Sequence, residues 1–311
     1  MVDLILFGDC KETLKQFPRG SAQMCVTSPP YYGLRDYGGE ANQIGQEETP
    51  EEFVNNLVEV FREVRDVLKD DGVLWLNIGD SYYNYRPGTG GLPKQTVSKT
   101  SQDLPTQCNR RANKLDGLKE KDLIGIPWML AFALRADGWY LRQDIIWHKP
   151  NPMPESVKDR CTKSHEYIFL LSKNKKYYYD NEAIKEPVKQ DWGTRNRDAG
   201  KYHNPGTGLQ PHSGLTKSYE RKNKRDVWSV TNKPYKGAHF ACFPPDLIEP
   251  CILAGSREGD VILDPFMGSG TTAMVAKQHD RSYIGCELHE DYGSLIQKRL
   301  KAIPTKLPFD V

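Results

Sequence analysis

The stretch VILDPFMGSGTT, residues 261–272, combines a short apolar strand, a glycine-rich turn and the beginning of a helix. The apolar run 261–263 predicts a buried strand, and the helix is expected from Thr271 onward. Glycines at the turn let a bound group approach the backbone, and helix amino termini favour anions. About one strand later, the run 283–287 ends at Glu287, which is placed to accept hydrogen bonds from ribose hydroxyls. The pattern predicts a cofactor site of nucleoside type in an α/β fold.

Further short apolar runs predict a large sheet of parallel type, alternating with helices. Helices are expected from Pro50 to a close at Gly72, from Ile126 to Gly138, from Pro245 to Gly255 and from Thr271 to His279. With the run at 261–263, seven strands are expected, at residues 4–7, 24–27, 73–78, 144–147, 167–171, 261–263 and 282–286.

The place of the glycine-rich turn in the chain separates two classes of enzyme. Its spacing, Gly268-x-Gly270-x-x-Ala273, also fits a nicotinamide-dependent dehydrogenase. Such a fingerprint normally opens the first strand of its domain, whereas most of the predicted sheet precedes this one. We therefore expect a circularly permuted fold, in which the cofactor strand is central in space but late in sequence.

A second string, Thr27-Ser28-Pro29-Pro30-Tyr31, follows the predicted strand 24–27. It offers a polar acceptor, two residues that stiffen the backbone and an aromatic ring, which is what an extruded nucleobase needs. A turn stiffened by proline explains Pro29 and Pro30 but not the whole string at the end of a strand. Together with the glycine-rich turn, the string indicates methyl transfer to the amine of a nucleobase.

The two strings resemble those of the S-adenosylmethionine-dependent DNA amino-methyltransferases. The resemblance is to the permuted group, in which an S/D/N-P-P-Y motif precedes the recognition domain and a D-P-F-x-G-S-G-T-T motif follows it. It covers nearly the whole chain and implies a circularly permuted, seven-stranded Rossmann-like sheet with S-adenosyl-L-methionine as cofactor. In this family the segments resembling 77–82 and 147–151 also belong to the site, the second of them near the target base.

The resemblance implies roles for individual residues. The catalytic residues would be Ser28, Pro29, Pro30 and Tyr31. The cofactor-binding residues would be Asp9, Thr27, Phe243, Pro244, Asp264, Phe266, Gly268, Ser269, Gly270, Thr271, Thr272 and Glu287. No metal ligands are expected.

The chemistry explains why the first string has these residue types. An exocyclic amine is a poor nucleophile because its lone pair is delocalised into the ring. If the Ser28 hydroxyl and the Pro29 carbonyl accept the amine hydrogens, the nitrogen can direct its lone pair at the methyl group. Tyr31 would stack on the extruded base. Ser28 is thus predicted to orient the amine and not to attack as a nucleophile.

Several alternatives remain open from the sequence. A serine at the position of Ser28 usually accompanies N4-methylation of cytosine in this family, so we favour cytosine over N6-methylation of adenine. Methylation at a ring carbon would need Cys251 of the Pro250-Cys251 dipeptide, which lies in a predicted helix and is expected to be a buried structural thiol. His165 and Glu166 are expected to have a structural or loop-orienting role. A catalytically silent DNA-binding protein is the alternative from another class.

Positive charge is concentrated in one part of the chain. Residues 173–236 carry 15 Lys and Arg against 7 Asp and Glu, which leaves −6 for the rest because the whole chain carries +2. Tyrosines and tryptophans are interspersed there, a mixture typical of phosphate and base contacts. The candidate DNA contacts are Lys149, Asn151, Lys175, Lys176, Arg195, Arg197, Arg221, Lys222, Lys224 and Arg225.

These patterns divide the chain into three parts. Residues 1–173 are expected to form the catalytic half, 174–236 the target-recognition region and 237–311 the cofactor-binding half. A loop at 82–122 is expected to close over DNA or to order on binding. Double-stranded DNA is the expected partner, with a cognate restriction endonuclease as a further one.

Composition limits the class of protein. The chain has 311 residues, of which 38% are hydrophobic, and it shows neither a signal peptide nor an apolar run of membrane length. Seven scattered cysteines without a C-x-x-C pair argue against a zinc cluster and a disulfide framework. We expect a cytoplasmic prokaryotic or phage protein that does not bind membranes and is a monomer or homodimer.

Overall fold

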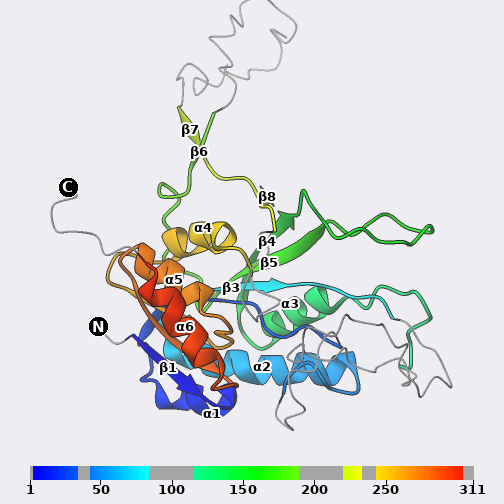
Figure 1. Ribbon diagram of the computed structural model, residues 1–311, viewed down its shortest axis with the longest axis horizontal. Helices are drawn as coiled ribbons and strands as arrows, with labels where there is room; N and C mark the ends of the chain where they lie inside the picture. Colours follow the sequence, from blue (N-terminus) through cyan, green and yellow to red (C-terminus); the bar gives the residue numbers. More distant parts are fainter. Residues whose placement is uncertain (1–2, 34–42, 84–114, 189–219, 233–242, 304–311) are drawn as a thin grey trace, which may run out of the picture.

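The protein is an α/β structure built on one large, mostly parallel sheet (Figure 1). The computed structural model describes residues 3–33, 43–83, 115–188, 220–232 and 243–303. The sheet contains β1 (Leu4–Phe7), β2 (Ala22–Thr27), β3 (Leu68–Ile78), β4 (Tyr140–His148), β5 (His165–Ser172), β8 (Val227–Ser229), β9 (Val261–Asp264) and β10 (Ser282–Glu287). Their order in space is β1-β10-β9-β2-β3-β5-β4-β8. The late strand β9 thus lies inside the sheet, between β10 and β2, as the position of the glycine-rich turn predicts.

All seven predicted strands are present, but the sheet has an eighth, β8, at its edge. Its three residues pair in parallel with the end of β4, and Trp228 alone of them is buried. Such a short segment has too little apolar periodicity to be recognised from the sequence.

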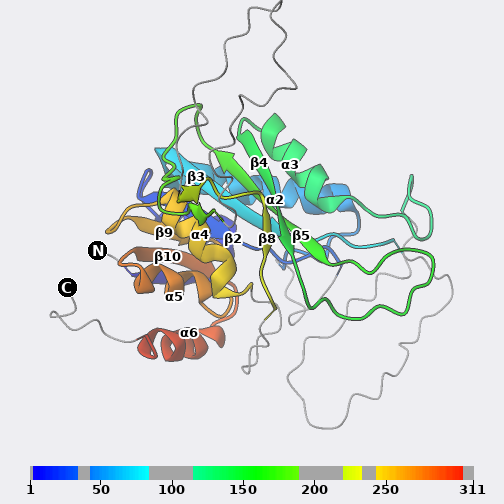
Figure 2. The ribbon, with the colours of Figure 1, turned by 90° about the horizontal axis from the view of Figure 1, so that it is seen from above.

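One strand also runs against the expected direction, since β5 is antiparallel to both β3 and β4. The ribbon between β4 and β5 extends beyond the end of the sheet and returns directly (Figures 1 and 2). Two neighbouring strands joined by a direct return of the chain pair antiparallel, because a parallel pair needs a crossover connection back to the starting edge of the sheet.

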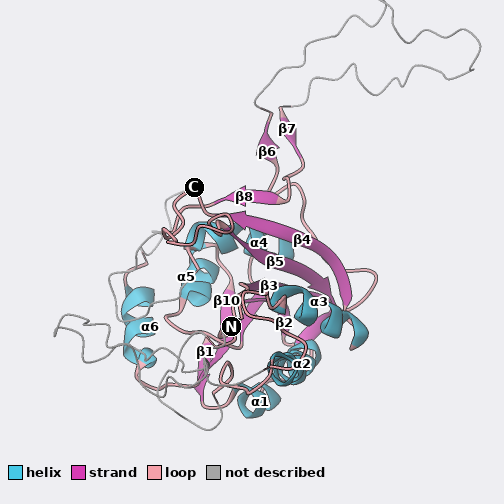
Figure 3. Ribbon diagram, turned by 90° about the vertical axis from the view of Figure 1, so that its right-hand side faces the viewer, coloured by secondary structure: helices cyan, strands magenta, loops and turns pink. Residues whose placement is uncertain are grey.

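Helices cover both faces of the sheet. One face carries α1 (Cys10–Thr13), a 3₁₀ turn (Leu14–Gln16), α2 (Pro50–Val67) and α3 (Ile126–Ala136), and the other carries α4 (Pro245–Gly255), α5 (Thr271–Gln278) and α6 (Tyr292–Lys301) (Figure 3). Successive residues of β3 serve the two cores, because Leu74 and Leu76 pack with α2 and α3 whereas Val73 and Trp75 pack with α4. Burial on both sides explains the continuous apolar runs. No helix in the described part of the chain is long and apolar enough to cross a membrane.

A small two-stranded ribbon stands away from the large sheet. It consists of β6 (Glu186–Pro187) and β7 (Arg221–Lys222), which pair antiparallel and project outward above β8 (Figure 3). Two of the predicted DNA contacts, Arg195 and Arg197, lie outside the described residues, as does most of the predicted loop 82–122.

Helix α2 begins as the sequence predicts but ends earlier. Thr49 and Glu52 form a reciprocal capping box, and Pro50 occupies the first turn. The helix ends at Val67, and Gly72 lies inside β3 and does not close the helix. A β-carbon on Gly72 would lie 2.8 Å from the Lys69 carbonyl oxygen and 3.0 Å from that of Gln23. Gly72 is therefore needed where β2 and β3 shift register and their backbones approach closely.

Replacing Gly72 by alanine tests this explanation. Because the contacting atoms belong to the backbone, Gly72→Ala should lower the free energy of unfolding by about 1–3 kcal/mol, measured by urea denaturation. The control is Arg19→Ala, which removes an exposed ion pair with Asp66 and should change stability by less than about 0.5 kcal/mol. An unchanged midpoint for Gly72→Ala would contradict the close backbone approach.

Candidate active site

The two predicted strings meet at one edge of the sheet. Strands β1, β10, β9, β2 and β3 are mutually parallel, so their carboxyl ends lie together. The loop 28–31 follows β2, and Asp264 ends the neighbouring strand β9. In parallel α/β sheets, ligands bind at this edge.

Asp264 joins the two strings through a buried carboxylate. Its Oδ1 accepts a hydrogen bond of 2.6 Å from the Thr27 hydroxyl, and its Oδ2 accepts one of 2.6 Å from the Thr272 hydroxyl. The backbone amide of Phe266 also donates to Oδ1, at 3.0 Å. Asp264 is 1% exposed, and burial raises its pKa while these donors oppose the rise. Asp264 and Thr27 are therefore buried and connect the two loops, and their predicted part in cofactor binding stays a prediction.

The glycine-rich loop is shaped by positive φ angles and by helix α6. Gly268 and Gly270 have φ values of 54° and 79°, a region that favours glycine. A β-carbon on Gly270 would lie 2.9 Å from Ile296 of α6. From the same helix, Arg299 donates to the Ser269 hydroxyl at 2.6 Å and to the Thr271 hydroxyl at 3.0 Å. Arg299 was not among the predicted site residues, because it lies far outside the glycine-rich string.

Two further carboxylates lie at the ends of the adjacent strands β10 and β1. Glu287 ends β10, where its Oε2 accepts from the Gly268 amide at 2.7 Å and its Oε1 from the His289 amide at 3.0 Å. Burial raises the pKa of Glu287. Asp9 follows β1, the neighbour of β10, and its side chain caps α1 by accepting from the Lys11 amide at 2.8 Å. Backbone amides thus hold both carboxylates at the predicted cofactor edge.

Tyr31 is held by residues from two other segments, β5 and the end of β3. Its hydroxyl donates to Glu166 of β5 at 2.7 Å and lies 3.5 Å from the Asn77 side-chain oxygen of β3. A β-carbon on Gly79 would lie 2.7 Å from the Tyr31 ring. Glu166 in turn forms an ion pair with Lys149. The contact between Glu166 and Tyr31 is the kind that a loop-orienting role requires.

The remaining residues of the predicted site lie in the loop after β2 and at the start of α4. Ser28 and Pro30 are partly buried and Pro29 is buried, in the loop between Thr27 and Tyr31. Phe243 and Pro244 immediately precede α4, and Pro244 is its N-cap. The other end of α4, at Gly255, packs against Met24 of β2 and against Val73 and Trp75 of β3.

Those predicted DNA contacts that the structure describes lie in more than one place. Lys149 is paired with Glu166, and Asn151 exchanges two hydrogen bonds with the Asn232 backbone, at 3.1 and 3.0 Å. Lys175 and Lys176 follow the end of β5, beside the beginning of β3. Because β5 is antiparallel, they lie at the edge opposite the site.

The other basic candidates lie around the small ribbon. Arg221 and Lys222 form β7, Lys224 lies over the Trp228 ring, and Arg225 forms an ion pair with Glu186 of β6. Lys222 approaches the same carboxylate at 3.5 Å. The positive charge of this segment is thus partly neutralised by Glu186.

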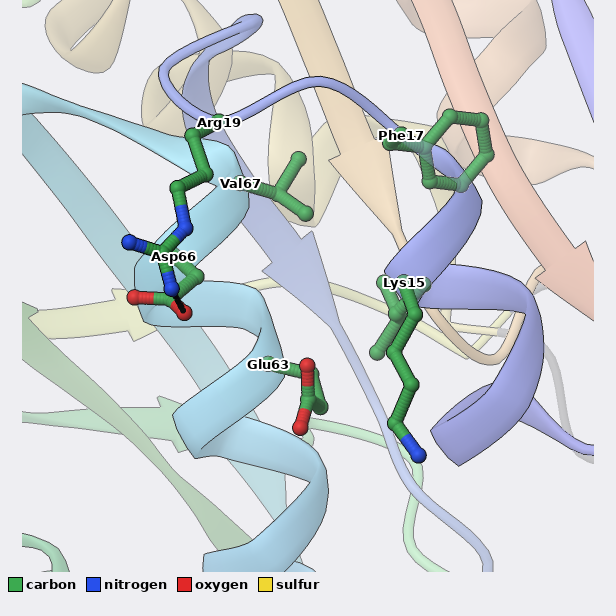
Figure 4. Close-up of a pocket in the computed structure, with 7 residues that line it drawn as sticks. Lys15, Phe17, Arg19, Glu63, Asp66 and Val67 are labelled. Carbon is green, nitrogen blue, oxygen red and sulfur yellow. Dashed lines mark hydrogen bonds and ion pairs between the residues drawn. The ribbon is translucent and has the colours of Figure 1, made fainter.

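A measurable hollow lies elsewhere on the protein. It has a volume of about 200 Å³ and is lined by residues of the 3₁₀ turn, of the segment before β2 and of the end of α2 (Figure 4). Arg19 and Asp66 form an exposed ion pair across it. It lies near the beginning of β2, away from the loop 28–31, and contains none of the predicted site residues.

Cys251 is unsuited to attack a nucleobase. It lies in α4, is 1% exposed and donates to the Leu247 carbonyl oxygen. Burial raises its pKa, which disfavours the reactive thiolate. The predicted role as a structural thiol agrees with this position.

The fold and site together define a nucleoside-cofactor α/β enzyme with an aromatic loop beside its cofactor strand. The sequence model described as DNA methylase, of the N6/N4 methyltransferases, matches residues 22–298. The chain therefore belongs to the S-adenosylmethionine-dependent DNA amino-methyltransferases, which confirms the predicted family and cofactor.

Curated relatives match over nearly the whole chain. The chain is 46% identical over 300 residues to the type II methyltransferase M.Cfr9I of Citrobacter freundii, covering 96% of this chain and 88% of the relative. It is 47% identical over 296 residues to M.SmaI of Serratia marcescens, covering 95% and 90%.

Solved structures share the fold. The cytosine-N4-specific PvuII DNA methyltransferase aligns with a TM-score of 0.61 at 18% identity, covering 97% of this chain and 87% of the other. TTHA0409 of Thermus thermophilus, in complex with S-adenosyl-L-methionine, aligns with a TM-score of 0.61 at 24% identity, covering 97% and 95%.

Removing the Asp264 carboxylate should damage both loops at once. Asp264→Ala leaves two hydroxyls and one amide without their acceptor, so we expect loss of S-adenosylmethionine binding in calorimetry and at least about 2 kcal/mol lower stability. The matched control is Asp260→Ala, at the other end of the same strand, where the side chain pairs with Lys69. Unchanged cofactor affinity in Asp264→Ala would refute this connecting role.

Proposed function

We propose that this DNA methyltransferase transfers a methyl group from S-adenosyl-L-methionine to the exocyclic N4 amine of cytosine in a specific DNA sequence. The observation that carries the proposal is the bond from Thr27 to Asp264. It holds the loop of Ser28 and Tyr31 beside the glycine-rich loop, so that an acceptor for an amine and a site for a nucleoside cofactor adjoin.

The residues at this edge fit the cofactor. Gly268 and Gly270 leave two positions of the turn without a side chain. The carboxylates of Glu287 and Asp9 keep lone pairs for hydroxyl or amine donors. Phe243 and Pro244, at the start of α4, would cover the remaining part of the cofactor. When bound, S-adenosylmethionine supplies a methyl group carried by a sulfonium sulfur. Thr27, Asp264 and Thr272 would act through the shape of the loops.

The protein's own contribution to the reaction is alignment. The Ser28 hydroxyl and the Pro29 carbonyl accept the two hydrogens of the target amine, which turns its lone pair out of conjugation with the ring. Tyr31 supports the flipped base, and Pro30 limits the movement of the loop. No covalent intermediate with the enzyme is needed, which agrees with the inert position of Cys251.

The choice of cytosine rests on Ser28. In the family that the motif resembles, a serine at this position usually accompanies methylation of cytosine, whereas an aspartate or asparagine usually accompanies methylation of adenine. A hydroxyl can accept from either amine, so the base is the part of the proposal that a product analysis has to decide.

We further propose that the chain order is a circular permutation and that recognition of the DNA sequence belongs to the region 174–236. Part of that region also packs into the large sheet and its helices, because β8 pairs with β4 and Asp180 bonds to Ala254 of α4. The reading surface would therefore centre on the ribbon of β6 and β7 and the chain that it carries. A cognate type II restriction endonuclease is the proposed physiological counterpart.

The first test is identification of the methylated base. Labelled S-adenosylmethionine and DNA should yield N4-methylcytosine by nucleoside mass spectrometry. Ser28→Ala and Tyr31→Ala should lose most turnover and retain cofactor binding, whereas Cys251→Ala should retain turnover. Detection of N6-methyladenine would overturn the choice of base, and no methylated base would overturn the enzymatic function.

The second test separates the two groups of basic residues by salt dependence. Each phosphate contact that a substitution removes should reduce the slope of log affinity against log salt by about 0.9. We expect this reduction for Arg221→Ala and Lys222→Ala, measured by fluorescence anisotropy with duplex DNA. Lys175→Ala and Lys176→Ala, at the opposite edge, should leave the slope unchanged. The reverse pattern would place DNA at the edge opposite the proposed site and overturn the assignment.

A further inference from the structure

The catalytic loop has a tether that its motif does not reveal. The Tyr31 hydroxyl donates to Glu166 Oε2 at 2.7 Å, although the two residues lie 135 positions apart. Glu166 reaches the site because β5 runs antiparallel, which brings its first residues to the edge where β2 and β3 end. The reversed strand therefore supplies a group that a wholly parallel sheet would not place there.

Glu166 is itself held in place by residues of two other segments. Lys149 forms an ion pair with its other oxygen, and the two side chains are only 16% and 14% exposed. Asn77 donates to the Tyr167 carbonyl oxygen at 3.0 Å and approaches Glu166 Oε2 at 3.4 Å. A shielded carboxylate requires such a counterion, and an ionised acceptor gives a stronger hydrogen bond than a neutral one.

The hydrogen bond to Glu166 restrains the hydroxyl end of the Tyr31 ring, which lies far from the backbone. Pro29 and Pro30 stiffen the chain before the ring, and Gly79 lies so close that a β-carbon there would come within 2.7 Å of it. A tyrosine ring fixed only through its backbone can still change rotamer. The bond to Glu166 adds a restraint on the direction of the hydroxyl and hence on the ring.

We propose that Glu166 is a positioning residue, which acts through the Tyr31 hydroxyl to hold the ring in the orientation that supports the flipped base. The proposal rests on the proposed function, because it concerns the step after the base has entered the site. It assigns Lys149 to the same device: Lys149 serves as the counterion of Glu166 and not as a contact to DNA phosphate.

A double-mutant cycle tests whether Glu166 acts through Tyr31. Tyr31→Phe keeps the ring and removes only the hydroxyl, while Glu166→Ala removes the acceptor. Each should lower kcat by about tenfold or more, the effect of losing a hydrogen bond to a charged group. Glu166→Ala should cause no further fall in the Tyr31→Phe background. Affinity for S-adenosylmethionine should be unchanged in all three.

Two variants keep the cycle interpretable. Glu166→Gln retains the shape and a neutral acceptor, so it should give a smaller loss of kcat, and it replaces Glu166→Ala in the cycle if thermal melting shows that variant to be unfolded. Glu59→Ala is the matched control. It removes a glutamate of α2 that is paired with Lys11 of α1, and it should leave kcat unchanged.

The outcomes distinguish this inference from the proposed function. Equal losses of kcat on mutating Glu166 in the parent protein and in the Tyr31→Phe variant would overturn the positioning role, as would full activity of Tyr31→Phe. Failure of the parent protein to methylate DNA would instead overturn the proposed function. Fluorescence of 2-aminopurine at the target position should still rise on binding in Tyr31→Phe, because flipping precedes the positioned step.

Discussion

One buried carboxylate holds the two halves of the site together. Asp264 accepts from Thr27 on one loop and from Thr272 on the other, and it is 1% exposed. Burying a carboxylate costs free energy unless hydrogen-bond donors surround it. The position of Asp264 and the positions of its donors therefore depend on one another. Thr27 and Asp264 lie 237 positions apart in the chain, and their contact joins the loop after β2 to the glycine-rich loop at a single edge of the sheet.

The remainder of the architecture follows from that edge. Parallel strands bring their carboxyl ends together, and the close approach of α6 to Gly270 fixes the cofactor loop from outside. The antiparallel strand β5 adds Glu166 to the same edge from the opposite direction. The proposed site thus combines backbone loops, which would bind the cofactor, with side chains from several strands, which would orient the target base.

Local patterns in the sequence could predict much of this structure, because they carry their own geometry. The glycine-rich turn and the proline-stiffened string have conformations set within a few residues, and the seven apolar runs are strands. Lys149, Lys175 and Lys176 have surroundings that no local pattern predicts, and their contact with DNA stays a prediction. Positive charge predicts contact with DNA, but an ion pair with Glu166 or a location at the opposite edge depends on strand direction. Arg299 and β8 were missed because their roles depend on tertiary contacts alone.

The effect of Thr27→Val on cofactor affinity tests whether Asp264 joins the two loops. Thr27 is the last residue of β2, and valine keeps the shape of its side chain while removing the hydroxyl that donates to Asp264. Titration calorimetry should show S-adenosylmethionine binding weakened by about tenfold, the equivalent of one hydrogen bond of about 1.4 kcal/mol. Cys25→Ala, buried two residues earlier on the same strand, should leave the affinity nearly unchanged. An unaltered affinity in Thr27→Val would contradict a site joined through Asp264.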